Sequence, residues 1–168
     1  DQSHIRLYSI KTKESHQITE TIHTDSDPVF DPEGKYIYFL SARTFNPVYD
    51  SMQFELSFPR GTKPYLVALR KDVPSPFVKE PKGFGMKPEN GFEEMKGDKD
   101  KEKKKIEPIE IDLDGIKERV ISFPVSEGIY AQIEAVKGKV FYTVNPITGS
   151  LNQDWPQVVP PPRSVIKV

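Results

Sequence analysis

The sequence predicts an all-β protein built from antiparallel sheets, and three observations support this fold class. Apolar and polar residues alternate in short runs, as they do in half-buried strands. Turn-forming Gly, Pro and Asp residues separate these runs. An apolar stripe with the helical period of about 3.6 residues is missing throughout.

The first region is expected to form two short strands around a polar turn. Ile5, Leu7 and Ile10 mark a strand in HIRLYSI, and KTKES supplies the turn. HQIT then has the pattern of a second short strand.

The stretch DSDPVFDPEGKYIYFLSAR contains a clear unit of strand, turn and strand. Residues 28–30 and 35–41 are the predicted strands, and residues 31–34 form the turn between them. Pro32 presets φ early in this turn, and Gly34 can adopt a positive φ at its end.

The predicted strand over residues 35–41 is apolar on both faces. Tyr36, Tyr38 and Leu40 alternate with Ile37 and Phe39. A strand of this kind is normally covered on both sides, so we expect it to lie between two packed sheets.

Two long connections interrupt the later strands. Residues 44–61 are predicted to form a loop, followed by a strand over residues 63–69 with Pro64 at its start, where a missing N–H is tolerated. Residues 79–108 contain the charged run GDKDKEKKK. Such a run buries too little apolar surface to offset its ordering entropy, so we expect a flexible surface insertion.

The C-terminal part repeats the strand pattern. Residues 109–113 alternate in the manner of a strand, Asp114 and Gly115 make a turn, and residues 119–123 form a strand that ends at Pro124. Further predicted strands are residues 129–136 and 140–144, which form a hairpin, and residues 164–168.

A unit of strand, Gly-containing turn and aromatic strand occurs twice. Gly34 and Gly138 are each followed by a lysine and an apolar strand. With the two long connections discounted, the units are about 50 residues apart, in the range of β-propeller blades. Blades are antiparallel four-stranded sheets that bury their faces on their neighbours, so the sequence predicts a β-propeller.

The same residues resemble a known family. DSDPVFDPEGKYIYFLSAR is similar to the P-x-F/W-S-P-D-G-K-x-I-x-F repeat of TolB-like and tricorn-like propellers, with Asp31 in place of the commoner Ser and Glu33 in place of the commoner Asp. RTFNPVYDSMQFELSF and PIEIDLDGIKERVISFPV resemble more specifically the propeller of tricorn-type serine peptidases. The resemblance covers nearly the whole chain.

This resemblance implies antiparallel blades of a β-propeller, one complete blade with partial flanking blades. Residues 1–26 would be the outer strands of a preceding blade. Residues 27–125 would be the complete blade, with a long loop over residues 43–62 and the charged insertion over residues 79–108. Residues 126–168 would be the inner strands of the next, truncated blade.

Composition argues against several classes of partner and site. The chain has 24 Lys and Arg against 25 Asp and Glu, well mixed, so nucleic acid is not an expected partner. No apolar run approaches the roughly 18 residues of a membrane span, so no membrane partner is expected. The absence of cysteine excludes disulfides and thiolate metal sites. We expect a cytoplasmic location, with a periplasmic one open if a signal peptide lies upstream.

The chain is expected to carry no catalytic residues, no metal site and no cofactor. His4, His16 and His23 all lie in the first part of the sequence, and no serine occupies a strand-to-helix elbow that would expose its hydroxyl. Asp112 and Asp114 in DLDG echo part of a calcium loop but lack its distal Glu. We therefore interpret this motif as an Asp-Gly turn.

The long loop is the best candidate for recognition of a substrate or partner. It combines Arg43, Phe45, Asn46, Tyr49 and Asp50. Loops longer than about 12–15 residues are often functional. Its aromatic residues would alternatively cap the end of the blade by packing, and the sequence leaves both interpretations open.

The resemblance implies a non-catalytic segment that guides or gates peptide substrates to a serine peptidase core outside this chain. The partner would then be a peptide or protein substrate of the parent. One alternative is a TolB-like module that binds a protein without any peptidase, and another is a propeller hydrolase of the oligopeptidase type. Open blade edges also lead us to expect self-association.

Overall fold

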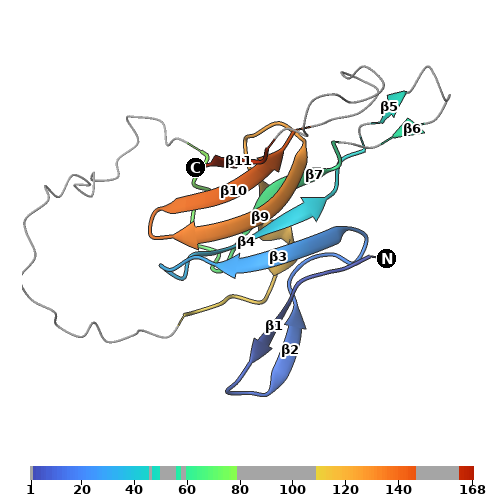
Figure 1. Ribbon diagram of the computed structural model, residues 1–168. Coiled ribbons are helices and arrows are strands. Elements are labelled where there is room, and N and C mark those ends of the chain that lie inside the picture. The colour runs from blue at the N-terminus through green and yellow to red at the C-terminus, as the bar shows by residue number, and fades with distance from the viewer. Residues whose placement is uncertain (1, 46, 50–55, 58–59, 79–108, 147–162) are drawn as a thin grey trace, which may run out of the picture.

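The structure is a computed structural model. A four-stranded antiparallel sheet forms the centre of the molecule (Figure 1). The structure describes residues 2–45, 47–49, 56–57, 60–78, 109–146 and 163–168. The strands of the central sheet are adjacent in the order in which they occur in the chain. They are β3 (Thr24–Phe30), β4 (Tyr36–Ala42), β7 (Thr62–Ala68) and β8 (Val120–Ser122).

Smaller sheets flank the central one. On one side lies a hairpin of β1 (Arg6–Ser9) and β2 (Glu14–Gln17), and on the other a three-stranded sheet with the order β11-β10-β9. The strands of that sheet are β9 (Ile129–Val136), β10 (Lys139–Asn145) and β11 (Val165–Lys167). A further short pair, β5 (Val48–Tyr49) and β6 (Leu56–Ser57), lies within the connection from β4 to β7.

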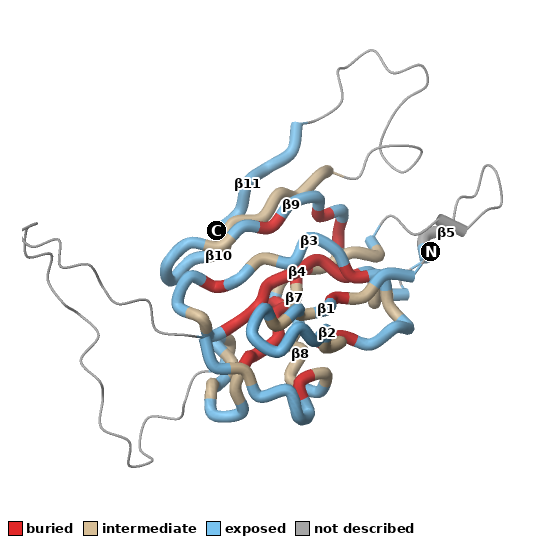
Figure 2. The backbone as a smooth tube through the Cα atoms, turned by 90° about the horizontal axis from the view of Figure 1, so that it is seen from below, coloured by how far each residue is buried: buried red, intermediate tan, exposed pale blue. Residues whose placement is uncertain are grey.

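Strand β4 is buried on both faces, as its sequence predicts. Tyr36, Tyr38 and Leu40 join a core cluster shared with the β9–β10 hairpin. Ile37 and Phe39 join a second cluster, which includes Ile5 and Ile18 from the region of the β1–β2 hairpin. Figure 2 shows the buried residues gathered in β4 and β7, between the two flanking sheets. The antiparallel, sheet-on-sheet packing of a propeller is confirmed.

The turn between β3 and β4 also forms as expected. Gly34 has a φ of 70°, in the left-handed region that favours glycine. The Asp31 carboxylate accepts hydrogen bonds from the backbone N–H groups of Glu33 at 3.2 Å and Lys35 at 3.1 Å. Asp31 thus satisfies the backbone of its own turn, which explains how an aspartate serves at this position.

Three local expectations differ from the structure. Residues 109–113 do not form a strand, although the Asp112 N–H bonds to the Leu69 carbonyl at 2.8 Å. After Gly115 the chain makes one turn of 3₁₀ helix, η1 (Ile116–Arg119), where only a turn was expected. The connection over residues 44–61, predicted as a loop, contains the β5–β6 pair. The insertion over residues 79–108 lies outside the described residues.

Strand β3 is longer than predicted and contains an irregularity. Its pairing with β4 shifts register between Ser26 and Val29, and Asp27 has a φ of 52°. This is the geometry of a β-bulge, which bends a strand and changes which residues face each side. Within the described ranges, no helix is long and apolar enough to cross a membrane.

Candidate functional site

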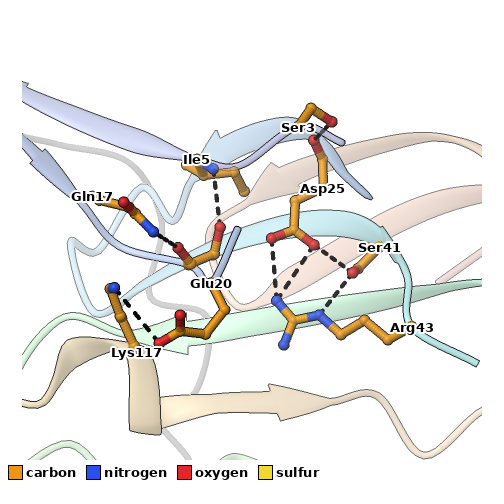
Figure 3. A network of polar contacts seen from close by, with 9 residues as sticks. Ser3, Ile5, Gln17, Glu20, Asp25, Ser41, Arg43 and Lys117 are labelled. Carbon is orange, nitrogen blue, oxygen red and sulfur yellow. Dashed lines mark hydrogen bonds and ion pairs between the residues drawn. The ribbon is translucent and has the colours of Figure 1, made fainter. Parts of the chain in front are cut away.

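The predicted recognition loop begins at Arg43, directly after β4, and this side chain is held against the sheet (Figure 3). The Arg43 Nε donates to the Ser41 hydroxyl at 2.7 Å, and Nη2 donates to the two Asp25 carboxylate oxygens at 3.3 and 3.2 Å. The Ser41 hydroxyl also donates to the Asp25 carboxylate. Asp25 lies on β3, so the contacts join two strands.

Burial makes these contacts important for the local structure. The Asp25 side chain is 0% exposed and the Arg43 side chain 15% exposed. A buried carboxylate is stable only when paired and hydrogen-bonded, and here Ser41 and Arg43 supply both needs. We call Asp25, Ser41 and Arg43 the loop-base network.

Aromatic rings complete the loop-base network. The Arg43 guanidinium carbon lies 5.5 Å from the centre of the Phe39 ring and 4.9 Å from that of Tyr65 on β7. These are cation–π distances, and a planar guanidinium suits such stacking better than an ammonium would. Arg43 therefore contacts residues of β3, β4 and β7 and fixes where the loop leaves the sheet.

The residue after Arg43 is also tied to the sheet. Burial raises the pKa of Tyr65, while Arg43 and a hydrogen bond with Thr44 act in the opposite direction. The net shift is upward, so the Tyr65 hydroxyl stays protonated at neutral pH. The first two residues after β4 are thus positioned by the sheet.

The N-terminal segment extends the network on its other side. The Ser3 hydroxyl donates to the Asp25 carbonyl at 2.8 Å, and the Asp25 N–H donates to the Ser3 carbonyl at 2.9 Å. Asp25 therefore has its backbone bound by one segment and its carboxylate by another. The loop-base network is a built structural element with its polar groups paired.

The remaining predicted loop residues are Phe45, Asn46, Tyr49 and Asp50. Phe45 is 80% exposed. Asn46 and Asp50 lie outside the described residues, as does the side chain of Tyr49 on β5. Asp25 and Ser41, the partners of Arg43, were not predicted as site residues. The available signal was limited to Ser41, a polar residue at the end of an otherwise apolar predicted strand, because Asp25 lies outside the predicted strands and joins β3 only in the structure.

A second feature is a cleft between β3 and β9, which lie side by side (Figure 1). The cleft has a volume of about 380 Å³. Its lining comes from both strands, with Asp27, Pro28 and Val29 on β3 and Gln132, Ile133 and Glu134 on β9. Both are edge strands of their sheets. The cleft therefore lies where two neighbouring sheets present their edges.

The polar groups near the predicted DLDG turn bind the protein itself. The Lys71 ammonium lies 2.6 Å from the Asp114 carboxylate, and the Lys71 N–H donates to the Asp112 carboxylate at 2.9 Å. The hydrogen bond and charge of Lys71 lower the pKa of Asp114. Among the described residues, no group of three or more His, Cys, Asp or Glu is arranged to hold a metal ion.

The histidines form no nucleophile–base pair within the described part of the chain. The His16 Nε2 lies 3.8 Å from the Glu14 carboxylate, and the His4 Nε2 is buried without a hydrogen-bond partner. The hydrogen bonds of the described serine hydroxyls go to groups other than histidine. The described residues therefore include no serine hydroxyl bonded to a histidine base.

Comparisons with known proteins place these features in a family. A family model described as the tricorn protease second beta propeller domain matches residues 1–166. Tricorn protease homolog 1 of Streptomyces coelicolor is 35% identical over 127 residues, covering 76% of this chain and 11% of that protein. A putative tricorn-like protease C-terminal subunit of Sulfurisphaera tokodaii is 40% identical over 134 residues, covering 79% and 13%.

A solved structure shows the same fold. The crystal structure of the tricorn protease matches with a TM-score of 0.67 at 22% identity, over 89% of this chain and 13% of that one. The chain thus spans about an eighth of the length of the proteins that it matches.

Proposed function

Because the chain belongs to the family of second β-propeller domains of tricorn proteases, we propose that it guides or gates peptide substrates toward a catalytic core outside the chain. The observation that carries this proposal is the cleft between the edge strands β3 and β9. Blades of a propeller surround a central channel, and strands at the inner edge of successive blades form its wall. An extended peptide in such a channel meets unpaired strand backbone.

The division into blades is part of this proposal. We assign residues 1–26 to the outer strands of one blade, residues 27–125 to a complete blade and residues 126–168 to the inner strands of the next. The four-stranded order β3-β4-β7-β8 supports a complete blade in the middle, although its first strand, β3, starts at Thr24, three residues before the assigned boundary. In this division β3 and β9 are the first strands of successive blades, which is why their shared cleft would face the channel.

The recognition loop has a place in the same proposal. Phe45, Asn46, Tyr49 and Asp50 are proposed to contact substrate or partner. Arg43, whose guanidinium binds Asp25 and Ser41, would act mainly by positioning the start of the loop. The cytoplasmic location predicted from the sequence remains a proposal, which cell fractionation tests.

Site-specific crosslinking tests the guiding role directly. A photoreactive benzoylphenylalanine replaces Gln132, which lines the β3–β9 cleft, and the chain is irradiated with an unfolded, radiolabelled peptide. We expect crosslinking at this position and none at the matched control Lys11, in the exposed turn between β1 and β2. Equal labelling at the two positions would contradict the proposal.

The absence of catalysis is tested with the same peptide. The purified chain should release no fragments from it. Cleavage that a serine-reactive inhibitor abolishes would overturn the non-catalytic assignment.

The matches to proteases favour this function over a TolB-like binding module without any peptidase. The discriminating observation is the remainder of the gene product. A serine peptidase core in the same polypeptide supports the guiding role, and a protein made of propeller blades alone supports the binding module.

Self-association through open blade edges is a further part of the proposal. Strand β11 is the edge of its sheet, and its Val165 and Ile166 side chains are 51% and 68% exposed. An exposed apolar edge strand pairs readily with another chain, and a lysine on the edge opposes this. Light scattering should show concentration-dependent growth in mass that Ile166→Lys reduces and the control Ile10→Lys, in the β1–β2 turn, leaves unchanged. A monomer at all concentrations would refute this.

A further inference from the structure

The β3–β9 cleft has acidic residues on both of its walls. Asp27 lies on the β3 side and Glu134 on the β9 side. Both residues are exposed, and neither carboxylate has a hydrogen-bond or ion-pair partner among the described residues. The cleft therefore presents two carboxylates whose charge no described side chain neutralises.

The two strands that form the cleft carry no basic residue. Neither β3, with the sequence TDSDPVF, nor β9, with the sequence IYAQIEAV, contains a lysine, arginine or histidine. The other acidic residue of β3, Asp25, is buried and paired with Arg43. Lys139, at the start of β10, lines a different cleft, beside Tyr36 and Tyr38. The charge that lines the β3–β9 cleft is thus of one sign.

Apolar residues supply the rest of the lining, apart from Gln132. Pro28 and Val29 belong to the β3 wall, and Ile133 belongs to the β9 wall. Ile133 is 4% exposed and joins the core cluster that the two sheets share, so the lining extends to the packed core. The cleft therefore combines apolar surface with anionic groups, and its volume of about 380 Å³ is within the range of ligand pockets.

The bulge in β3 determines where Asp27 lies. Asp27 has a φ of 52°, within the stretch where the pairing of β3 with β4 shifts register. Bulges at sheet edges change the direction of a side chain, as at this edge strand. Besides glycine, Asn and Asp are the residues that adopt this left-handed conformation most readily. Asn at position 27 should therefore keep the backbone and remove only the charge.

These properties select a class of peptide side chain. Lysine and arginine have long apolar stems that pack on apolar surface while their charged ends reach polar groups. In this cleft the stem would contact Pro28 and Val29, and the charged end would pair with a carboxylate. We propose that the β3–β9 cleft selects peptide segments that carry a lysine or arginine beside apolar residues, and repels acidic ones. This rests on the proposed guiding function and names a substrate class for the same site.

Fluorescence anisotropy tests the proposal with three labelled peptides, identical except for a central lysine, glutamine or glutamate between valines. We expect the lysine probe to bind the 168-residue chain about 2- to 10-fold more tightly than the glutamine probe at low salt, because two exposed carboxylates attract it. The glutamate probe should bind most weakly. Added salt should reduce these differences, because the charges are exposed.

Variants of the two carboxylates locate the effect in the cleft. Asp27→Asn and Glu134→Gln should each weaken binding of the lysine probe about 2- to 5-fold and leave the glutamine probe nearly unchanged. The charge reversal Glu134→Lys should weaken the lysine probe and tighten the glutamate probe, an exchange that a merely distorted cleft would not produce. The matched control is Glu14→Gln, which removes the same charge from an exposed residue of β2 outside the cleft.

Equal binding of the three probes would overturn the proposal. So would cleft variants that behave like Glu14→Gln, because the lysine probe would then occupy another surface. The crosslinking at Gln132 reports contact with an unfolded peptide whatever its charge, so it judges the guiding function separately. Crosslinking there without a preference among the probes refutes the charge selection alone, whereas equal labelling at Gln132 and Lys11 contradicts the guiding function itself.

Discussion

The polar groups at the two ends of strand β4 lie in different environments, one buried and one open to solvent. At the Ser41 end, Asp25 and Arg43 pair with each other inside the protein. At the Tyr36 end, the Tyr36 hydroxyl donates to the Pro74 carbonyl at 2.7 Å, and a cleft opens beside Tyr36 and Tyr38 whose lining includes charged side chains of both signs. A fully paired buried network fixes a structure, whereas charged groups at an open cleft stay in contact with solvent. The comparison separates a buried positioning element from a solvent-open cleft.

The largest effect on stability is expected when the loop-base network at the Ser41 end of β4 is disrupted. Arg43→Ala leaves the Asp25 carboxylate buried without its cation, and loss of one partner of a buried pair costs about 3–5 kcal/mol. Arg43→Lys should fall between Arg43→Ala and the unmodified chain, because an ammonium cannot reproduce the fork of hydrogen bonds or the stacking. Urea unfolding measures the free-energy differences.

The matched control for Arg43 is Arg6→Ala. Arg6 also bonds to a serine, at 3.0 Å to the Ser15 hydroxyl, but at an exposed position. It should change stability by less than about 0.5 kcal/mol. If the Arg43 and Arg6 variants lose similar stability, the buried network does not have the structural role assigned to it.

A smaller effect on stability is expected when two glycines in the turns near the Tyr36 end of β4 are replaced. Gly34 and Gly138 have φ values of 70° and 73°, so alanine at either position is strained by about 1–2 kcal/mol. A Cβ on Gly34 would also lie 3.1 Å from the Ile109 Cγ1, whereas one on Gly138 meets no atom within 4 Å. Gly34→Ala should therefore lower the thermal midpoint more than Gly138→Ala. The reverse order would show that the Ile109 contact is unimportant.

The smallest effect on stability concerns the exposed ion pair between Lys71 and Asp114. Lys71 lowers the pKa of Asp114, so the folded state favours the ionised carboxylate. Any stability from this pair is present above the ordinary pKa of Asp and is lost as pH falls through the lowered folded-state value. Asp114→Asn should reduce the acid dependence of stability slightly, and added salt should weaken the difference. Unfolding midpoints across acidic pH measure it.

Much of the fold could be predicted because local patterns and tertiary packing agree. The strand over residues 35–41 needed cover on two sides, and the flanking sheets provide it. The turn at residues 31–34 could be read from Pro32 and Gly34, whose backbone preferences are intrinsic. The strand predicted from the alternation at residues 109–113 was wrong, because a strand also needs a partner. In the described structure the neighbouring edge of β7 pairs with β8 instead.

The loop-base network could not be derived from local patterns. Arg43 was predicted as a loop residue, but its partner Asp25 lies 18 residues earlier. The bulge between Ser26 and Val29 sets the pairing of Asp25 with Ser41. A register change of one residue would turn Asp25 to the other face of the sheet. Sequence alternation alone does not reveal such a shift.

The amino-acid sequence by itself determined the all-β class, the turns and the need of β4 for two covering sheets, because these follow from side-chain polarity and backbone preference. Only the tertiary structure decided which polar groups became paired and which remained available beside a cleft. That outcome depends on strand register and on the meeting of sheets distant in the chain. The loop-base network and the cleft between β4 and the β9–β10 hairpin therefore became visible only once the strands had been placed.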